Sequence, residues 1–245
     1  MSKTRLDQAL VQKGLVKTRS QAENYIKLGY VQVGGQVVTK PGQKVGSNDS
    51  LAVDLTYQYV SRAGLKLASA ADKLGLDFKD KIVLDVGSST GGFTDYALRQ
   101  GAGKVIAVDV GTDQLHHSLK GDKRIELHEK TDIRSLKKLS TTPDIVLIDV
   151  SFISLREILP PIIKLAGHKC QIVALLKPQF EAGKQQINRG VVKNDRLRRQ
   201  ILKDFENWVK DLFNIISKAD SEIAGSKGNR ERFYLLYSLK GTGVE

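Results

Sequence analysis

The 245-residue sequence is poor in cysteine and has no long apolar run. Cys170 is its one cysteine, so the chain cannot form an internal disulfide, which excludes a disulfide-stabilised secreted fold. Residues 1–10 lack the apolar segment of a signal peptide, and no later run approaches the length of a membrane span. The four histidines are not spaced as metal ligands. We therefore expect a cytoplasmic protein without a membrane segment or a metal site.

Acidic residues are also in short supply. The chain has 39 Lys and Arg against 27 Asp and Glu, a net charge of +12. This excess indicates a polyanionic partner, most simply a nucleic acid, although a generally basic soluble surface would give the same count. The hydrophobic fraction of 40% is ordinary for a globular protein, and the length allows one large or two unequal domains.

The most informative stretch is 81–95. An apolar run, 82–86, predicts a buried parallel strand, a Gly/Ser-rich turn follows, and a helix is expected after it. This order is typical of the ligand-binding corner of a doubly wound α/β sheet. A dinucleotide site would need a glycine at Ser89, because a side chain there crowds a pyrophosphate. Asp85 would also repel phosphate and suit an ammonium group.

The stretch resembles the first motif of S-adenosylmethionine (SAM) methyltransferases. That resemblance implies cofactor contacts from Asp85, Gly87, Ser88, Ser89, Gly91, Gly92 and Phe93. An ordinary strand-to-helix turn is the structural alternative. A second strand, 104–108, ends at Asp109, whose carboxylate is placed to accept hydrogen bonds from ribose hydroxyls. Asp132 follows a short third strand, 126–129, and either contacts an adenine amino group or caps the next helix.

Two further apolar runs end in charged residues. Strand 145–148 leads to Asp149, and strand 171–176 leads to Lys177, so both side chains are expected at the ligand crevice. The run after Asp149 lacks the prolines with which amine-directed base methyltransferases usually clamp a base, which argues against that chemistry. Strands near 215–219 and 233–239 are expected to close the sheet.

Residues 1–56 predict a separate small domain of two helices and a hairpin with Gly34-Gly35 at its turn. With its recurring cations, this unit resembles the alpha-L RNA-binding domain, an α+β fold. The resemblance implies RNA contacts from Arg5, Lys17, Arg19 and Lys27. A dimerisation module with a solvated charged face is the alternative. Residues 57–60 would form a linker to a second domain, 61–245.

The whole chain resembles the TlyA family, which joins an alpha-L domain to an FtsJ-like (RrmJ-like) methyltransferase and some members of which carry the name haemolysin. The motifs are 61–67 (SRAGLKL), 84–95 (LDVGSSTGGFTD), 149–155 (DVSFISL), 177–181 (KPQFE) and 227–231 (KGNRE). The family implies a Rossmann-like class I fold, SAM as cofactor, and 2′-O-methylation of cytidines in ribosomal RNA or ribosomal subunits. Its catalytic tetrad would fall on Lys66, Asp149, Lys177 and Glu231.

The residue types suit that reaction. A ribose hydroxyl must lose a proton as it attacks the methyl group, and we expect Lys177 to accept it. Lys66 would favour the neutral form of Lys177 and stabilise the developing alkoxide, while Asp149 and Glu231 orient the two lysines. Unrelated surface ion pairs are the alternative for these four residues. Competing functions are a non-catalytic ribosome-assembly factor, a base-directed methyltransferase and, least favoured, a pore-forming haemolysin.

Overall fold

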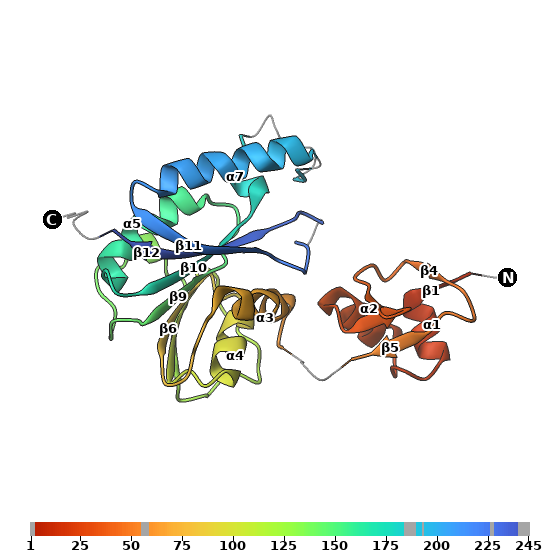
Figure 1. Cartoon of the computed structure of the whole chain (residues 1–245). Coiled ribbons are helices and arrows are strands. Elements are labelled where there is room, and N and C mark those ends of the chain that lie inside the picture. Colours follow the sequence, from red (N-terminus) through yellow and green to blue (C-terminus); the bar gives the residue numbers. More distant parts are fainter. Residues whose placement is uncertain (1–2, 55–58, 184–189, 193, 226–227, 240–245) are drawn as a thin grey trace.

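The computed structural model describes residues 3–54, 59–183, 190–192, 194–225 and 228–239 of the chain. The first elements form a small module, at the right of Figure 1, and the remainder surrounds one large sheet. The module contains β1 (Thr4–Arg5), α1 (Leu6–Gln12), α2 (Arg19–Leu28), β2 (Val31–Val33), β3 (Gln36–Val37), β4 (Lys44–Val45) and β5 (Leu51–Val53). The two helices pack on the strands through apolar side chains such as Leu6, Leu10 and Ile26.

The predicted hairpin of the module is confirmed. β2 pairs antiparallel with β3, and Gly34 and Gly35 at the turn both have positive φ, which glycine adopts without strain. Thr18 caps α2 by accepting a hydrogen bond from the Gln21 amide. The module therefore owes its shape to local signals that are visible in the sequence.

The described part of the chain forms a seven-stranded sheet with strand order β11-β12-β10-β9-β6-β7-β8. Its parallel strands are β6 (Ile82–Val86), β7 (Lys104–Val108), β8 (Ile125–His128), β9 (Ile145–Ile148) and β10 (Gln171–Leu176). The antiparallel strands β12 (Arg232–Ser238) and β11 (Phe213–Asp220) complete one edge. The chain runs outward from β6 to β8 and then returns to β9 beside β6, so the strand order reverses between β6 and β9. In open α/β sheets ligands bind at this reversal.

Helices cover both faces of the sheet (Figure 1). On one face lie α3 (Arg62–Leu74) and α4 (Gly92–Arg99), and on the other lie α5 (Leu155–Ala166) and α7 (Asp195–Val209). Each side has its own apolar cluster, one including Leu67 and Phe93 and the other Leu159 and Phe205. The Rossmann-like α/β class expected from the sequence is confirmed.

Three local expectations need correction. The sequence predicts Asp195 as the N-cap of a long helix, but Asn194 caps α7, because its side chain accepts hydrogen bonds from the amides of Arg196 and Leu197. The sequence also predicts a loop at 179–194. Its first residues belong to a helical turn, α6 (Pro178–Glu181), and most of its remainder lies outside the described residues. The helix expected after Asp132 is a three-residue 3-10 turn, η1 (Ile133–Ser135).

The small module is attached to the larger part by specific contacts. The Tyr30 hydroxyl donates a hydrogen bond to the Tyr59 carbonyl at 2.6 Å. The Tyr59 ring packs against Tyr96, and the Arg99 guanidinium lies over the Tyr59 ring at 5.4 Å from its centroid. The Val60 amide donates a hydrogen bond to the Asp95 carboxylate. The predicted linker, 57–60, lies partly outside the described residues, but its last two residues are held by both parts of the chain.

Candidate active site

The loops after β6 and β9 meet at the reversal of the strand order. Gly87, which follows β6, has φ of 83°, and a Cβ atom there would lie 2.8 Å from the Asp149 carbonyl oxygen. A larger residue would therefore push the two loops apart. Glycine at this position lets the cofactor motif and the candidate catalytic segment approach each other closely.

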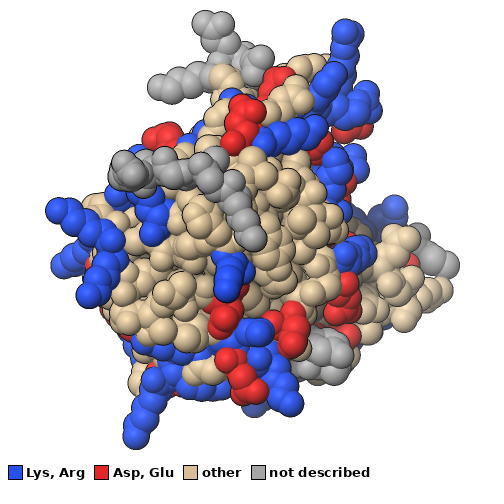
Figure 2. Space-filling model, turned by 60° about the vertical axis from the view of Figure 1, so that its left-hand side comes forward, with Lys and Arg blue, Asp and Glu red and all other residues tan. Residues whose placement is uncertain are grey.

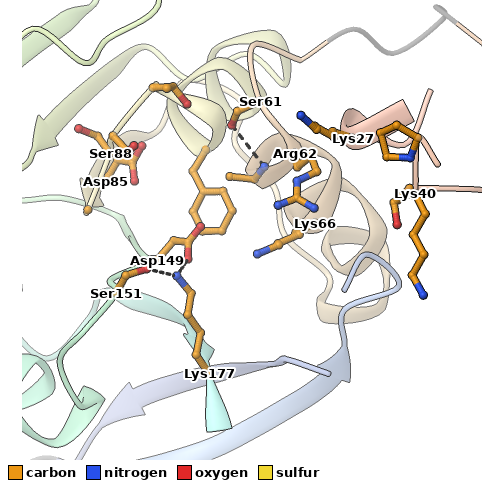
Figure 3. A pocket seen from close by; sticks show the side chains of 17 residues that line it. Lys27, Lys40, Ser61, Arg62, Lys66, Asp85, Ser88, Asp149, Ser151 and Lys177 are labelled. Atoms are coloured by element: carbon orange, nitrogen blue, oxygen red, sulfur yellow. Dashed lines mark hydrogen bonds and ion pairs between the residues drawn. The ribbon is translucent and has the colours of Figure 1, made fainter. Parts of the chain in front are cut away.

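Lys177 follows β10 and lies at the centre of the site. Its side-chain nitrogen is 2.6 Å from Asp149 Oδ1 and donates a hydrogen bond to Ser151 Oγ at 2.8 Å. Its side chain is only 9% exposed, and Figure 3 shows it reaching the Asp149 segment from the neighbouring strand. A buried lysine held from two sides in this way has a defined direction, which a proton acceptor needs.

Lys66 and Glu231 form the second pair. Lys66 lies on α3, and its nitrogen is 2.6 Å from the Glu231 carboxylate, which precedes β12. Both side chains are buried, at 9% and 2% exposed. Three residues of the predicted tetrad, Lys66, Lys177 and Asp149, line the same cavity. The fourth, Glu231, does not line it but is paired with Lys66. The helix pattern alone points Lys66 away from the apolar residues of α3 and predicts a solvated lysine, and the 9% exposure of its side chain contradicts that prediction.

Two cavities meet at this point, with volumes of ≈ 770 Å³ and ≈ 580 Å³. They share Gly87, Ser89, Asp149 and Ser151. The first contains the lysines and the bottom of the Gly/Ser-rich turn, and the second contains the ends of β7 and β9. Their combined shape offers room for an elongated ligand beside a second reactant.

Asp85 and Ser88 present polar atoms without partners to the first cavity. Among the described residues, Asp85 Oδ1 and Ser88 Oγ are buried and accept or donate no hydrogen bond, whereas Asp85 Oδ2 accepts one from Thr94 at 2.6 Å. Burial raises the pKa of Asp85 to about 7, with a smaller contribution from the nearby Asp149 carboxylate. A ligand with an ammonium group would satisfy Asp85 and favour its ionised form.

The second cavity has the features of an adenosine site. Asp109 accepts hydrogen bonds from the amides of Ser89 at 2.8 Å and Gly111 at 2.7 Å, which fixes its carboxylate at the cavity wall. Each carboxylate oxygen keeps acceptor capacity for a ribose hydroxyl. Asp132 also lines this cavity, and the capping alternative is realised, because its side chain accepts from the Arg134 amide at the start of η1.

Gly91 and Gly92, predicted as cofactor contacts, line neither cavity. They shape the turn instead. Gly91 caps α4 with φ of 87°, and a Cβ atom on Gly92 would lie 2.2 Å from Ser61 Oγ, so α3 can approach only a glycine here. Phe93, Ser88 and Ser89 do line the first cavity, as predicted neighbours of a ligand.

Several wall residues were not singled out by sequence reasoning. The apolar walls of the second cavity include Val110, Ile133, Val150 and Ile153. Phe152 lines it as well, is 91% exposed, has a strained φ of 66°, and contacts Phe180 at a ring-centroid distance of 5.1 Å. The motif 149–155 was recognised as a whole, but nothing in its spacing marks Phe152 as solvent-exposed.

Cations from the small module reach the first cavity. Lys27 and Lys40 line it together with Arg62 and Lys66. Figure 3 shows Arg62 between Lys66 and Lys40, with Lys27 on the side of Ser61. Lys40 and Arg62 were not predicted, and Arg62 stands in the recognised motif 61–67. The sequence feature that could have identified Arg62 is its positive charge in the same motif as Lys66.

The predicted RNA-binding cations differ in their surroundings. Arg5 and Arg19 both contact the fully buried Asp7 carboxylate at 2.9 Å, and the Arg5 guanidinium lowers the pKa of Asp7 to about 2. These two arginines thus stabilise the module whatever else they bind. Lys17 is exposed, and Lys27 is 61% exposed and 3.9 Å from Glu23.

The surface charge is not a single basic face in the view of Figure 2. Lys and Arg side chains form separate clusters near the margins, with Asp and Glu among them. Among the described residues, no helix is long and apolar enough to cross a membrane, and no group of three or more His, Cys, Asp or Glu side chains is arranged to hold a metal ion. The cations that line the first cavity are therefore more informative than the net charge.

Comparison with known proteins agrees with the architecture. Residues 59–238 match the FtsJ-like methyltransferase family, and residues 4–51 match the S4 domain. The 16S/23S rRNA (cytidine-2′-O)-methyltransferase TlyA of Mycobacterium tuberculosis is 36% identical over 240 residues, covering 96% of this chain and 90% of that protein. Hemolysin A of Brachyspira hyodysenteriae is 38% identical over 232 residues, covering 93% and 97%.

A solved structure from Streptococcus thermophilus that carries the name hemolysin superposes with a TM-score of 0.74. It is 38% identical, and the match covers 98% of this chain and 90% of the other. The agreement therefore extends over both parts of the molecule. The chain belongs to the FtsJ-like methyltransferase family and carries an S4 domain at its N-terminal end.

Proposed function

We propose that this protein is a cytoplasmic SAM-dependent methyltransferase that methylates the ribose 2′-hydroxyl of a cytidine in ribosomal RNA. The observation that carries the proposal is the pair of buried lysines, Lys66 and Lys177, each within 2.6 Å of a carboxylate and both lining one cavity. The name of the Mycobacterium tuberculosis relative supports the same substrate class. We propose further that residues 1–56 and 61–245 act as two domains joined by 57–60.

The chain offers partners for each part of SAM. Asp85 and Ser88 would hold the methionine end in the first cavity, with the backbone of Gly87 and Ser89 beside it. Asp109 would hold the ribose, and the apolar wall with Val110 and Ile133 would cover the adenine. Bound SAM would supply an electrophilic methyl group on a sulfonium. This distribution supports SAM because the unpaired atoms Asp85 Oδ1 and Ser88 Oγ suit the charged amino-acid end of the cofactor, and the Asp85 carboxyl would repel a phosphate.

The lysines and carboxylates would then handle the proton. In the proposed reaction the 2′-hydroxyl loses its proton to the amine form of Lys177 as its oxygen bonds to the methyl carbon. The bond from that carbon to the sulfonium sulfur breaks at the same time, and the sulfur leaves as a neutral thioether. Asp149, 2.6 Å away, faces the lysine cation that results, and Ser151 keeps the nitrogen in place. Lys66, oriented by Glu231, would stabilise the negative charge that develops on the ribose oxygen.

The RNA strand would enter over the cations of the first cavity. Lys27 and Lys40 of the S4 domain and Arg62 of α3 lie on the approach to the tetrad. They are suited to phosphates on either side of the target nucleotide, because phosphate contacts place an RNA without reading its sequence. The exposed ring of Phe152, in the wall of the adjoining second cavity, is suited to stack on the target base.

The test is methyl transfer from labelled SAM to separated, unmodified 30S and 50S ribosomal subunits, followed by digestion and mass analysis of the nucleosides. We expect 2′-O-methylcytidine from at least one subunit. A methylated base would retain the SAM site but contradict the role of the tetrad. Absence of transfer despite SAM binding would favour a non-catalytic assembly factor.

Binding of the RNA gives an independent test. The affinity for ribosomal RNA should fall steeply between low and moderate salt, because the proposed contacts release counterions. The double variant Lys27→Ala/Lys40→Ala should reduce the slope of log affinity against log salt by about 2, or about 1 for each lost phosphate contact. Lys73→Ala, an exposed lysine paired with Glu222, is the control. An unchanged slope in the double variant would contradict the proposed path.

A further inference from the structure

Glu181 is a buried carboxylate that the proposed reaction does not use. It ends α6, the helical turn directly after Lys177 and Pro178, and its side chain is 3% exposed. Among the described residues, the ion pair of Glu181 is with Arg156, at 3.8 Å, and Arg156 is itself 40% exposed, so no closer described cation compensates the burial. Burial raises the pKa of Glu181, and its hydrogen bonds oppose that rise. Burial of a carboxylate without a close cation is unfavourable, so the contacts that Glu181 makes should explain why it is buried.

Its two oxygens hold the start of α5. Oε2 accepts a hydrogen bond from Ser154 Oγ at 2.6 Å, and Oε1 accepts one from the Leu155 amide at 2.7 Å. Ser154 is the N-cap of α5, and the Leu155 amide is one of the donors that a helix leaves unpaired at its N-terminus. Glu181 therefore fixes the point at which the segment after β9 becomes helical.

That segment, 149–154, carries the groups that face the proposed substrate. Its beginning is held by Lys177, which contacts Asp149 and Ser151. Its end is held by Glu181. Phe152 stands between these anchors with a ring that is 91% exposed and a φ of 66°, so burial does not hold it in place. A strained residue persists only where its surroundings determine it.

The neighbouring segment, 177–181, supplies every one of these contacts. β9 and β10 are adjacent parallel strands, so the segments that follow them run side by side. Lys177 contacts the first part of 149–154, Phe180 contacts Phe152 at 5.1 Å, and Glu181 contacts the last part. The catalytic lysine and the exposed ring thus belong to one cross-linked unit.

We propose that Glu181 is a positioning residue of the methyltransferase, which locks segment 149–154 against segment 177–181 so that Phe152 and Lys177 meet the target nucleotide together. This inference rests on the proposed function. Glu181 lines neither cavity, so we assign it no direct contact with the RNA or the cofactor. A merely structural carboxylate would affect stability alone.

The test is Glu181→Gln, because glutamine keeps the size but its amide nitrogen cannot accept a hydrogen bond. With unmodified ribosomal subunits and labelled SAM, well below the melting temperature, we expect kcat to fall about tenfold, as misplacement of reacting groups does. Glu206→Gln is the matched control: that carboxylate is 20% exposed and accepts hydrogen bonds from Lys218 and Tyr234 away from the site. It should lower Tm but leave kcat unchanged.

A double-mutant cycle with Phe152→Ala separates positioning from stability. If Glu181 acts by placing Phe152, Glu181→Gln should lower kcat much less in the Phe152→Ala background than in wild type. Ser154→Ala removes one of the two hydrogen bonds and should give a smaller loss in the same direction, which keeps the test valid if Glu181→Gln does not fold. A lower Tm with unchanged kcat, or losses that simply multiply, would overturn the proposal. An inactive wild type would instead refute the proposed function.

Discussion

Glu231 and Arg232 are neighbours in the sequence, yet they belong to charge clusters on opposite faces of the sheet. Glu231 contacts Lys66 of α3, and that lysine lines the first cavity. Arg232 donates to Asp220 of β11, which also accepts from Arg198 of α7. Because side chains alternate along an extended chain, one residue faces the α3 side and the next faces the α7 side. Two similar ion pairs therefore have different surroundings.

The difference lies in what remains for a ligand. Asp220 accepts from two arginines, whose pull lowers its pKa to about 2 despite the opposing effect of burial. Arg198 also donates to the Arg230 carbonyl, so the described hydrogen bonds of this cluster join its members to one another and to the backbone, and none of its three residues lines either cavity. Lys66 has three N–H donors and directs one at Glu231, which leaves donors for a substrate in the cavity. Access to a cavity, and not burial or pairing, distinguishes a candidate catalytic pair from a structural one.

The largest effect is expected from Lys177→Ala. If this lysine accepts the ribose proton, kcat for methyl transfer should fall about 10³-fold or more, while SAM affinity measured by calorimetry stays near wild type. Lys218→Ala, which removes a lysine paired with Glu206 on the α7 side, should leave kcat unchanged. Retained turnover in Lys177→Ala would mean that the pair of Lys177 with Asp149 is structural, like the pair of Lys218 with Glu206.

Glu231→Gln is expected to come next. Glutamine can still accept a hydrogen bond from Lys66, but it carries no charge and should hold the lysine less firmly. We therefore expect kcat to fall about 30-fold. The neighbouring variant Arg232→Lys should change stability more than kcat. If Glu231→Gln and Arg232→Lys gave the same ratio of kcat loss to stability loss, the ion pair on the α3 side would not differ in role from the cluster on the α7 side.

Asp220→Asn tests the other cluster. Asparagine keeps one acceptor oxygen but removes the charge and the second acceptor that face the two arginines. We expect a loss of about 2 kcal/mol in unfolding free energy, a figure already reduced because Asp220 is 38% exposed. Urea unfolding measures the loss. Because the folded pKa is depressed, the contribution of Asp220 is present above pH 4 and disappears as the pH falls toward 2. A variant as stable as wild type at pH 7 would contradict the structural role.

The sequence allowed the strands and the ligand corner to be predicted, because both depend on local patterns. The apolar run 82–86, the glycine turn and Asp85 predicted the corner of the sheet at which both cavities lie, and the cofactor contacts themselves stay a prediction. The pairing of Lys66 with Glu231 joins residues 165 positions apart and could not follow from any local pattern. It was expected only through resemblance to a family.

The spacing of residues in the sequence also did not predict which side chains form caps, ion pairs or exposed surfaces at the ends of helices and strands. Asn194 and Asp195 are both good helix caps, and only the observed hydrogen bonds assign the cap to Asn194. The sequence predicts RNA contacts from Arg5 and Arg19. It does not show that Asp7, two residues after Arg5, contacts both arginines. The exposure of Phe152 depends on how two loops meet, which the order of residues alone does not specify.

Asp85 offers the subtlest contrast with Asp220. Both are aspartates of the same sheet, but Asp85 is fully buried and no cation is among the causes of its pKa shift, so its pKa is raised to about 7, against about 2 for Asp220. The free protein then holds Asp85 mostly neutral below pH 7, and the ammonium group of SAM needs it ionised. SAM affinity should therefore rise about tenfold from pH 6 to pH 8, which corresponds to one pKa-linked proton. Calorimetry in buffers of different ionisation enthalpy measures the released proton. Asp85→Asn should retain only the pH dependence of SAM itself, and an unchanged profile in that variant would show that Asp85 does not face the ammonium group.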